Sequence, residues 1–217
     1  RQVSQLNRGK KTAGFDGIKS LNFKQRTKLA IELKIIREGK PVRRVLIPKA
    51  DKKEKRLLGI PTMYDRAAQA LAKLALEPEW ETKFEANSYG FRPARSAHDA
   101  IEAIFIGLRG KPKYILDADI SKCFDKINHT TLLKKINTYP TMRKTIKSWL
   151  SSGVLDKFCV QTSGEGVPQG SPLSPLLANI ALHGMEETIK ELYPSDKANY
   201  IKVSVIGKEK GRISKPD

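Results

Sequence analysis

The segment YILDADISKCFDKINH, residues 114–129, decides which fold this chain adopts. Its first seven residues alternate between two faces, with Ile115, Asp117 and Asp119 on one side and Leu116 and Ala118 on the other. This period of two predicts a β-strand over residues 114–120. Helical patterns follow at 129–137 and 140–151. A strand that alternates with helices is typical of an α/β or α+β fold.

The two carboxylates of this strand are its chemically informative residues. Asp117 and Asp119 share a face, and carboxylates on an apolar strand are costly to bury unless they are paired or bind a metal. Mg²⁺ prefers oxygen ligands and leaves positions for substrate phosphates, which favours metal-assisted phosphoryl transfer. A strand that runs out into solvent would carry the same residues, so this pair alone does not decide.

The residues before this strand predict a basic region that mixes helices and a hairpin. The expected elements are an irregular segment at 1–20, a helix at 24–38, hairpin strands at 42–48 and 56–60, a helix that Thr62 begins and Pro78 ends, and a helix capped by Ser96 and Asp99 that runs through Leu108.

Two loops carry residues suited to ligand contact. The stretch SYGFRP, residues 88–93, combines aromatic side chains with Arg92, which suits base stacking and phosphate contact, although a turn anchored in the core is equally consistent. The stretch GVPQGSP, residues 166–172, lets the backbone approach a ligand closely, although a plain turn has the same composition. A strand at 157–162 precedes this second loop, and one long helix is expected to follow it through Ile189.

The charge of the chain points to a polyanionic partner. Its 217 residues include 41 Lys and Arg against 23 Asp and Glu, a formal net charge of +18. Residues 1–60 alone hold 18 basic and 5 acidic residues, and residues 197–217 hold six basic and two acidic residues. A basic face kept for solubility is the alternative, but the asymmetry favours nucleic-acid binding.

Other classes of protein are disfavoured. No apolar run reaches the roughly 18 residues of a membrane span, and residues 1–11 lack the apolar core of a secretory signal. Cys123 and Cys159 have no zinc-ribbon spacing and are expected to be free thiols in a reducing cytosol. The three histidines are scattered and form no metal-binding or catalytic spacing.

Six ordered blocks together resemble one family. They are KTAGFDG (11–17), RRVLIPK (43–49), RLLGIPTMYDRAAQ (56–69), LEPEWETKFEANSYGFRPARSAHDAI (76–101), YILDADISKCFDKINH (114–129) and GVPQGSPLSPLLANI (166–180). The chain resembles a group II intron reverse transcriptase, or maturase, up to about Met185. The resemblance implies the fingers and palm of a right-hand polymerase, Mg²⁺-dependent DNA synthesis on an RNA template, and binding to the intron's own RNA, which assists splicing and mobility.

The resemblance also implies roles for individual residues. Asp119 matches the first metal-binding aspartate of the palm, and Ile120 would offer its carbonyl oxygen to the second metal. Phe124 stands five residues after Asp119 at the steric-gate position that excludes a ribose 2′-hydroxyl. Gln169 matches the glutamine of the nucleotide pocket. Lys49 and Arg56 match residues that hold the incoming triphosphate, and Arg92 is a candidate for contact with template RNA or nucleotide. The basic charge of residues 1–60, rather than the resemblance, makes Lys10, Lys11, Arg43 and Arg44 candidates for RNA binding.

One expected motif does not occur in these 217 residues. The paired aspartates of the family, usually Y-A-D-D, are missing from the sequence, so we expect fingers plus an incomplete palm. The expected divisions are an N-terminal basic extension at 1–20, fingers at 21–112, a partial palm at 113–195 and a basic Lys/Gly-rich segment at 196–217. Because one aspartate cannot hold a two-metal clamp, the chain is expected to bind RNA without polymerising.

Several alternatives stay open. The chain could serve as an RNA-binding maturase module without polymerase function, or as an unrelated basic protein whose six blocks match by chance. Template RNA with a DNA primer and dNTPs are the partners that the polymerase interpretation implies. An incomplete palm would expose apolar surface and favour self-association, and the expected location is the cytoplasm of a bacterium or the interior of an organelle.

Overall fold

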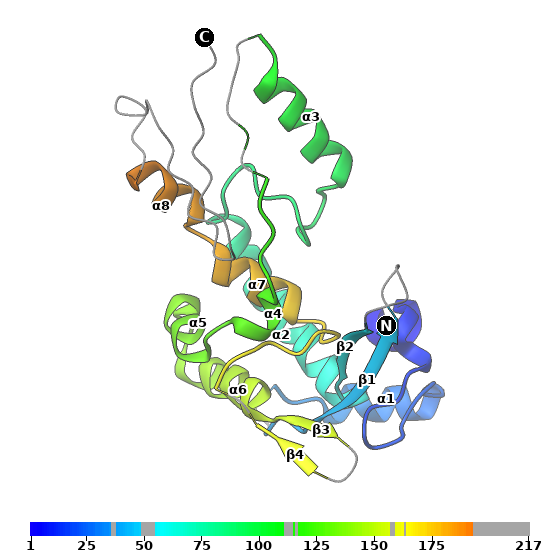
Figure 1. Ribbon diagram of the computed structural model, residues 1–217. Helices are drawn as coiled ribbons and strands as arrows, with labels where there is room; N and C mark the ends of the chain where they lie inside the picture. Colours follow the sequence, from blue (N-terminus) through cyan, green and yellow to red (C-terminus); the bar gives the residue numbers. More distant parts are fainter. Residues whose placement is uncertain are drawn as a thin grey trace. The chain divides into compact units, whose positions relative to one another are not determined.

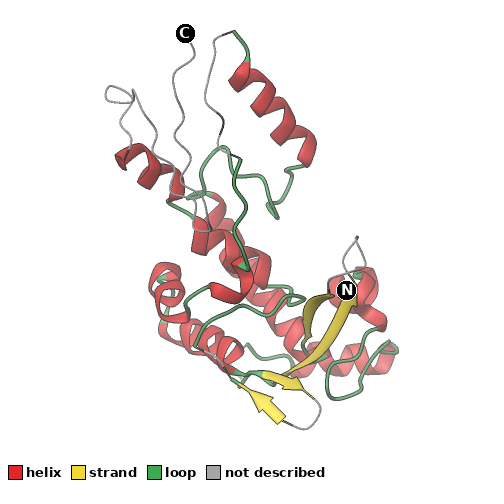
Figure 2. Ribbon diagram, in the orientation of Figure 1, coloured by secondary structure: helices red, strands yellow, loops and turns green. Residues whose placement is uncertain are grey.

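The computed structural model describes residues 1–35, 38–48, 55–110, 115, 117–156, 159–162 and 164–192. Helices make up most of the described chain, and strands form one small sheet (Figure 2). The chain forms two compact units, Arg1–Ala181 and Leu182–Asp217. This mixture of helices and a mixed sheet agrees with the expected α/β class. The expected division into fingers and palm stays a prediction.

The sheet is built around the predicted hairpin. Strand β1 (Val42–Pro48) pairs antiparallel with β2 (Lys55–Ile60), with Val45 opposite Leu58. Strand β3 (Val154–Asp156) lies parallel to β1, and β4 (Cys159–Gln161) lies antiparallel to β3, so the order is β2-β1-β3-β4 (Figure 1). The hairpin is confirmed. Strand β3 was not predicted. Strand β4 covers part of the strand expected at 157–162, of which residues 157 and 158 lie outside the described residues and Thr162 is not in the strand.

Helix α2 (Met63–Glu81) follows the hairpin directly and forms the centre of the larger unit. Its start is as predicted, because the Thr62 hydroxyl accepts from the Asp65 amide and donates to the Asp65 carboxylate at 2.6 Å. The prediction that Pro78 ends the helix is wrong, since the helix continues to Glu81. Leu76 and Trp80 are each 3% exposed, and burying both side chains offsets the cost of a proline in the last turns.

The hydrophobic core is helical. Helices α5 (His129–Ile136), α6 (Pro140–Ser151) and α7 (Ser174–Leu182) bury their apolar faces with α2. The most deeply buried side chains, at 0% exposure, are Ala72, Met142, Ile146 and Ile180. The helices predicted at 129–137 and 140–151 are confirmed by α5 and α6.

The N-terminal residues are more ordered than predicted. The expected irregular segment contains two short helical turns, η1 (Gln2–Leu6) and η2 (Arg8–Lys11), and α1 (Phe23–Glu32) begins with an Asn22–Gln25 capping box. The helix expected at 24–38 is therefore shorter, ending at Glu32. The buried Arg66 side chain fastens this region to α2 by donating to the carbonyl oxygens of Gly9 (2.9 Å), Thr12 (2.6 Å) and Pro61 (2.9 Å).

The strand predicted over 114–120 is not formed by its described residues. Residues 117–120 are irregular and exposed, and Tyr114 and Leu116 lie outside the described residues. A strand is stable only beside a hydrogen-bonded neighbour, and no strand of the described residues pairs with this segment. A short helix that was not predicted, α4 (Cys123–Lys126), follows.

The remaining helices refine two expectations. Helix α3 (Ala97–Leu108) begins with the predicted capping box between Ser96 and Asp99. The single long helix expected after residue 172 is two helices, because Gly184 adopts φ +87° between α7 and α8 (Met185–Leu192). None of the helices that the structure describes has the length and apolar character that a membrane crossing requires.

Candidate nucleotide-binding site

The loop Gly166–Gly170 is hydrogen-bonded to α4. The amide of Val167 donates to the carbonyl oxygen of Phe124 at 2.7 Å, and the amide of Gly166 donates to that of Ile127 at 2.9 Å. Gly166 adopts φ +93°, and a Cβ there would lie 3.3 Å from the Asp125 carbonyl oxygen. The loop and α4 therefore lie in direct backbone contact, which only a small residue at position 166 allows.

The same loop is also joined to the basic hairpin. The amide of Gly59 in β2 donates to the carbonyl oxygen of Gln169 at 2.7 Å. At Gly170, φ is +114° and a Cβ would lie 2.9 Å from the Gly59 carbonyl oxygen, so any side chain would push the loop and strand apart. The structure thus brings together two regions of predicted function that are more than 100 residues apart in sequence.

Buried hydroxyl groups hold the far end of the loop. The Ser171 hydroxyl donates to the Gln69 side chain of α2 at 2.8 Å, and the Ser174 hydroxyl donates to the Pro168 carbonyl oxygen at 2.7 Å. Gln69 is 5% exposed, so this hydrogen bond lies in the core and is shielded from water. The loop is therefore supported from α2 and α7 while its tip contacts α4 and β2.

A cavity of about 220 Å³ lies where these elements meet. It is bounded by Leu57 and Gly59 of β2, Asp125 of α4, and Val167 and Gln169 of the loop. Ligand sites commonly measure about 300–1,000 Å³, so this space suits part of a nucleotide better than a whole one.

The predicted metal ligands lie at the surface beside α4. Asp119 and Ile120 are exposed, and Asp119 lies near enough to Cys123 for its charge to act on that thiol. Burial, aided by the negative charge of Asp119, raises the pKa of Cys123, which is a free thiol. No group of three or more His, Cys, Asp or Glu side chains that could hold a metal occurs among the described residues. They do not supply a complete Mg²⁺ site, and no reaction step is derived through the ion.

Phe124 makes contacts that fit both of its possible roles. Its half-buried ring packs against the main core, as a structural anchor would. The ring also meets that of Phe91 in an edge-to-face arrangement, with centroids 6.4 Å apart and planes at 80°.

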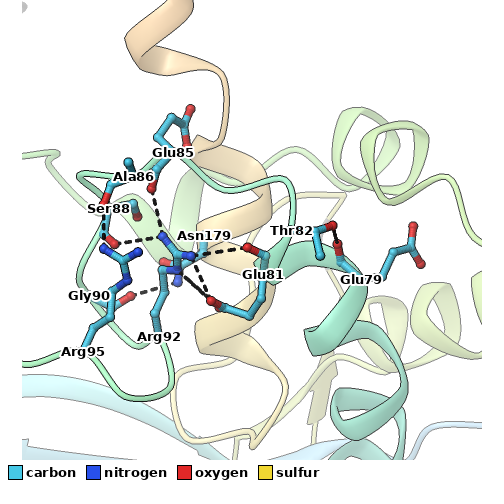
Figure 3. Close-up of polar contacts among 10 residues, drawn as sticks. All are labelled: Glu79, Glu81, Thr82, Glu85, Ala86, Ser88, Gly90, Arg92, Arg95 and Asn179. Carbon is cyan, nitrogen blue, oxygen red and sulfur yellow. Dashed lines mark hydrogen bonds and ion pairs between the residues drawn. The ribbon is translucent and has the colours of Figure 1, made fainter.

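Arg92 lies inside the protein rather than on an open surface. Its guanidinium forms a two-pronged ion pair with the Glu81 carboxylate at 2.8–3.2 Å (Figure 3). The residue is 7% exposed, and the guanidinium lies 5.2 Å from the Phe84 ring centroid. It also donates to the carbonyl oxygens of Glu85 at 2.8 Å and Ser88 at 3.0 Å. These contacts give Arg92 a structural role, and its contact with RNA stays a prediction.

The other predicted residues are distributed along the N-terminal half. Lys49 lies outside the described residues, as does the side chain of Arg56, whose backbone pairs with Ile47 in the hairpin. Lys10 donates to the Gln5 carbonyl oxygen at 2.7 Å, whereas Lys11 is exposed. Arg43 and Arg44 are half-buried on β1. No described contact brings these basic residues together with Asp119.

Several residues that shape the site were not predicted. The sequence did contain an indication for Gly59, because a glycine inside a strand often marks a place where another backbone segment approaches closely. Phe91 also had a partial signal in its aromatic, glycine-containing loop. No sequence pattern indicated Glu81 or Asn179, because their partners lie elsewhere in the sequence. Glu81 pairs with Arg92, and the Asn179 side chain donates to the Gly90 carbonyl oxygen at 2.8 Å.

The sequence of the chain also matches that of known proteins. Residues 47–204 match the family described as reverse transcriptase (RNA-dependent DNA polymerase). The chain belongs to the reverse transcriptase family. It is 40% identical over 155 residues to the group II intron-encoded protein LtrA of Lactococcus lactis subsp. cremoris, covering 70% of this chain and 26% of LtrA. Maturase-like protein 1 of Euglena gracilis is 32% identical over 194 residues, covering 86% of this chain and 41% of that protein.

These relatives place the chain among the group II intron reverse transcriptases and maturases. The protein YkfC of Escherichia coli is 36% identical over 216 residues, a match that covers 91% of this chain and 55% of YkfC. The chain therefore spans about half or less of the length of these relatives.

Proposed function

We propose that the chain supplies the nucleotide-binding side of an RNA-directed DNA polymerase and contributes to binding its intron RNA. The observation that carries this proposal is the loop Gly166–Gly170, which contacts both α4 and the basic hairpin. Gln169, Asp125 of α4 and β2 thereby border one cavity, and the backbone of Arg56 lies in β2, whereas Lys49 lies outside the described residues. A basic hairpin beside a nucleotide pocket is suited to stabilising the charge of a triphosphate.

Phe124 is proposed to exclude ribonucleotides. The carbonyl oxygen of Phe124 accepts from the Val167 amide, so its backbone is joined to the loop that carries Gln169. An aromatic ring at that position fills the space that a 2′-hydroxyl requires. The alternative, an anchor for the turn, predicts equal damage to both kinds of nucleotide.

These 217 residues are proposed to lack polymerase activity by themselves. The paired aspartates of the family do not occur in the sequence, and Asp119 alone provides one carboxylate at the proposed position. Asp119 and Ile120 would hold Mg²⁺ only together with further ligands. When bound, the ion would supply charge neutralisation of the phosphates.

Primer extension tests this proposal. The test protein, called here the extended polymerase, continues the chain through a Y-A-D-D segment and the thumb. It should copy an RNA template, Asp119→Ala should abolish synthesis, and Asp117→Ala, the matched control, should retain it. Robust synthesis by the 217-residue chain, or tolerance of Asp119→Ala, would overturn the proposal.

The RNA-binding maturase module remains the second candidate function. The N-terminal basic residues favour it, because the excess positive charge of residues 1–60 is larger than a triphosphate needs. Arg66 holds the first residues of this region in a defined position on α2. Both functions are compatible in one protein, and salt-dependent RNA binding, developed below, tests the second.

Self-association is also proposed. Three side chains in the range expected to form the partial palm are 48–69% exposed, namely Ile115, Ile120 and Tyr139, which leaves apolar surface there. Sedimentation at micromolar concentration should show an oligomer, and a monodisperse monomer would refute it.

A further inference from the structure

The contact between Phe91 and Phe124 joins a loop to helix α4, and strained backbone conformations occur at Phe91 itself and just before α4. Phe91 adopts φ +61°, and Lys122, two residues before Phe124, adopts φ +53°. Bulky residues rarely occupy this left-handed region, and they persist there when the surrounding structure holds them in place. The ring pair at 6.4 Å is therefore flanked on both sides by backbone that the fold constrains.

Polar contacts hold the loop that carries Phe91. The residue before it, Gly90, accepts from the Asn179 side chain of α7 at 2.8 Å, and the residue after it is Arg92, with its ion pair to Glu81 (Figure 3). Arg92 is 7% exposed, so this attachment is buried. Phe91 itself is 64% exposed. The buried network thus presents a largely exposed aromatic ring, and the described contact of that ring is with Phe124.

An exposed phenylalanine in a strained conformation contributes little as a core residue. Its position is instead suited to limiting how the Phe124 ring rotates and leans, because an edge-to-face pair has a preferred geometry. The opposite side of Phe124 is limited by its packing against the core. We propose that Phe91 is a positioning residue that holds the Phe124 ring in place and thereby sets the discrimination against ribonucleotides. The inference rests on the proposed function of Phe124 as a gate.

The extended polymerase allows a direct test with a pair of variants at position 91. Phe91→Gly removes the ring while leaving a residue that tolerates φ +61° without strain, and Phe91→Tyr keeps the aromatic ring. Phe23→Ala is the matched control, because Phe23 is 74% exposed and lies on α1. The measurement is the ratio of kcat/KM for a ribonucleotide to that for the deoxynucleotide, together with the melting temperature.

Loss of an aromatic pair is expected to raise the ratio about two- to tenfold in Phe91→Gly. Phe91→Tyr and Phe23→Ala should leave it unchanged. Phe91→Gly combined with Phe124→Ala should match Phe124→Ala alone, because a positioning residue has no effect once its target ring is gone.

Two results separate the failure of this inference from the failure of the gate. If Phe124→Ala raises the ratio and Phe91→Gly does not, Phe91 has no positioning role and the gate stands. If Phe124→Ala leaves the ratio unchanged, the gate is wrong and the inference falls with it. An equal loss with both nucleotides in Phe91→Gly, with a lowered melting temperature, would assign Phe91 a purely structural role.

Discussion

Replacing Arg92 with alanine provides a sharp test of how the loop at residues 85–95 is held. The change removes the ion pair with Glu81, the hydrogen bonds to the carbonyl oxygens of Glu85 and Ser88, and the contact with the Phe84 ring. If Arg92 is structural, the free energy of unfolding should fall. If Arg92 contacts RNA, the affinity for RNA should fall instead.

The magnitude follows from the burial of the two partners. Removing one member of a buried ion pair costs about 3–5 kcal/mol, because the remaining charge is left uncompensated. The Arg92 side chain is 4% exposed, but that of Glu81 is 23% exposed, so water can partly solvate the carboxylate once it is alone. We therefore expect a loss near the lower end, about 3 kcal/mol, which lowers the melting temperature of a chain of this size by about 6–12 °C.

Urea and thermal denaturation of the 217-residue chain measure this loss, and fluorescence anisotropy with a structured RNA measures affinity. Arg92→Lys should recover only part of the stability, because an ammonium group cannot reproduce the two-pronged contact with Glu81. Arg95→Ala is the matched control: Arg95 is half-buried, donates to the Ala86 carbonyl oxygen and lies 5.4 Å from the Tyr89 ring centroid, but it forms no ion pair among the described residues. Its removal should cost about 1 kcal/mol, less than that of Arg92. An Arg92→Ala protein with an unchanged melting temperature and a large loss of RNA affinity would refute the structural assignment.

Three further predictions concern RNA, nucleotide and thiol chemistry. The chain should bind structured RNA with an affinity that falls steeply as the salt concentration rises, with a log–log slope of about 0.7–0.9 per phosphate neutralised. An affinity that does not change with salt would exclude residues 1–60 as the RNA-binding surface. The slope should decrease when four residues are neutralised together, namely Lys10, Lys11, Arg43 and Arg44. In the extended polymerase, Lys49→Ala or Arg56→Ala should lower kcat/KM for dNTPs about 10- to 150-fold with template affinity unchanged, and an equal loss of RNA affinity would contradict this. Burial and the charge of Asp119 raise the pKa of Cys123, so this thiol should react with iodoacetamide more slowly than free cysteine at pH 8. The rate of reaction should rise as the pH increases. The variant Asp119→Asn should speed the reaction only modestly, since burial is the larger cause of the raised pKa.

Local patterns in the sequence were sufficient for elements whose ends are set by nearby residues. Alternation of apolar residues predicted the hairpin, and capping residues predicted the starts of α2 and α3. Helical periodicity predicted the positions of α5 and α6. Six ordered motifs were also sufficient to indicate the family, because residue order along the chain carries that information without reference to three-dimensional contacts. The candidate residues Phe124 and Gln169 came from the same motifs.

Tertiary contacts decided the features that depend on distant partners. Helix α2 passes through Pro78 because Trp80 is buried in the core, whereas residues 117–120 form no strand because no described strand pairs with them. Arg92 lies in a motif suited to contact with RNA, yet in the structure its guanidinium forms an ion pair with Glu81 inside the protein. The ring contact between Phe91 and Phe124 likewise required the fold. Periodicity and capping act over a few residues, but burial, ion pairing and backbone approach depend on which distant segments meet.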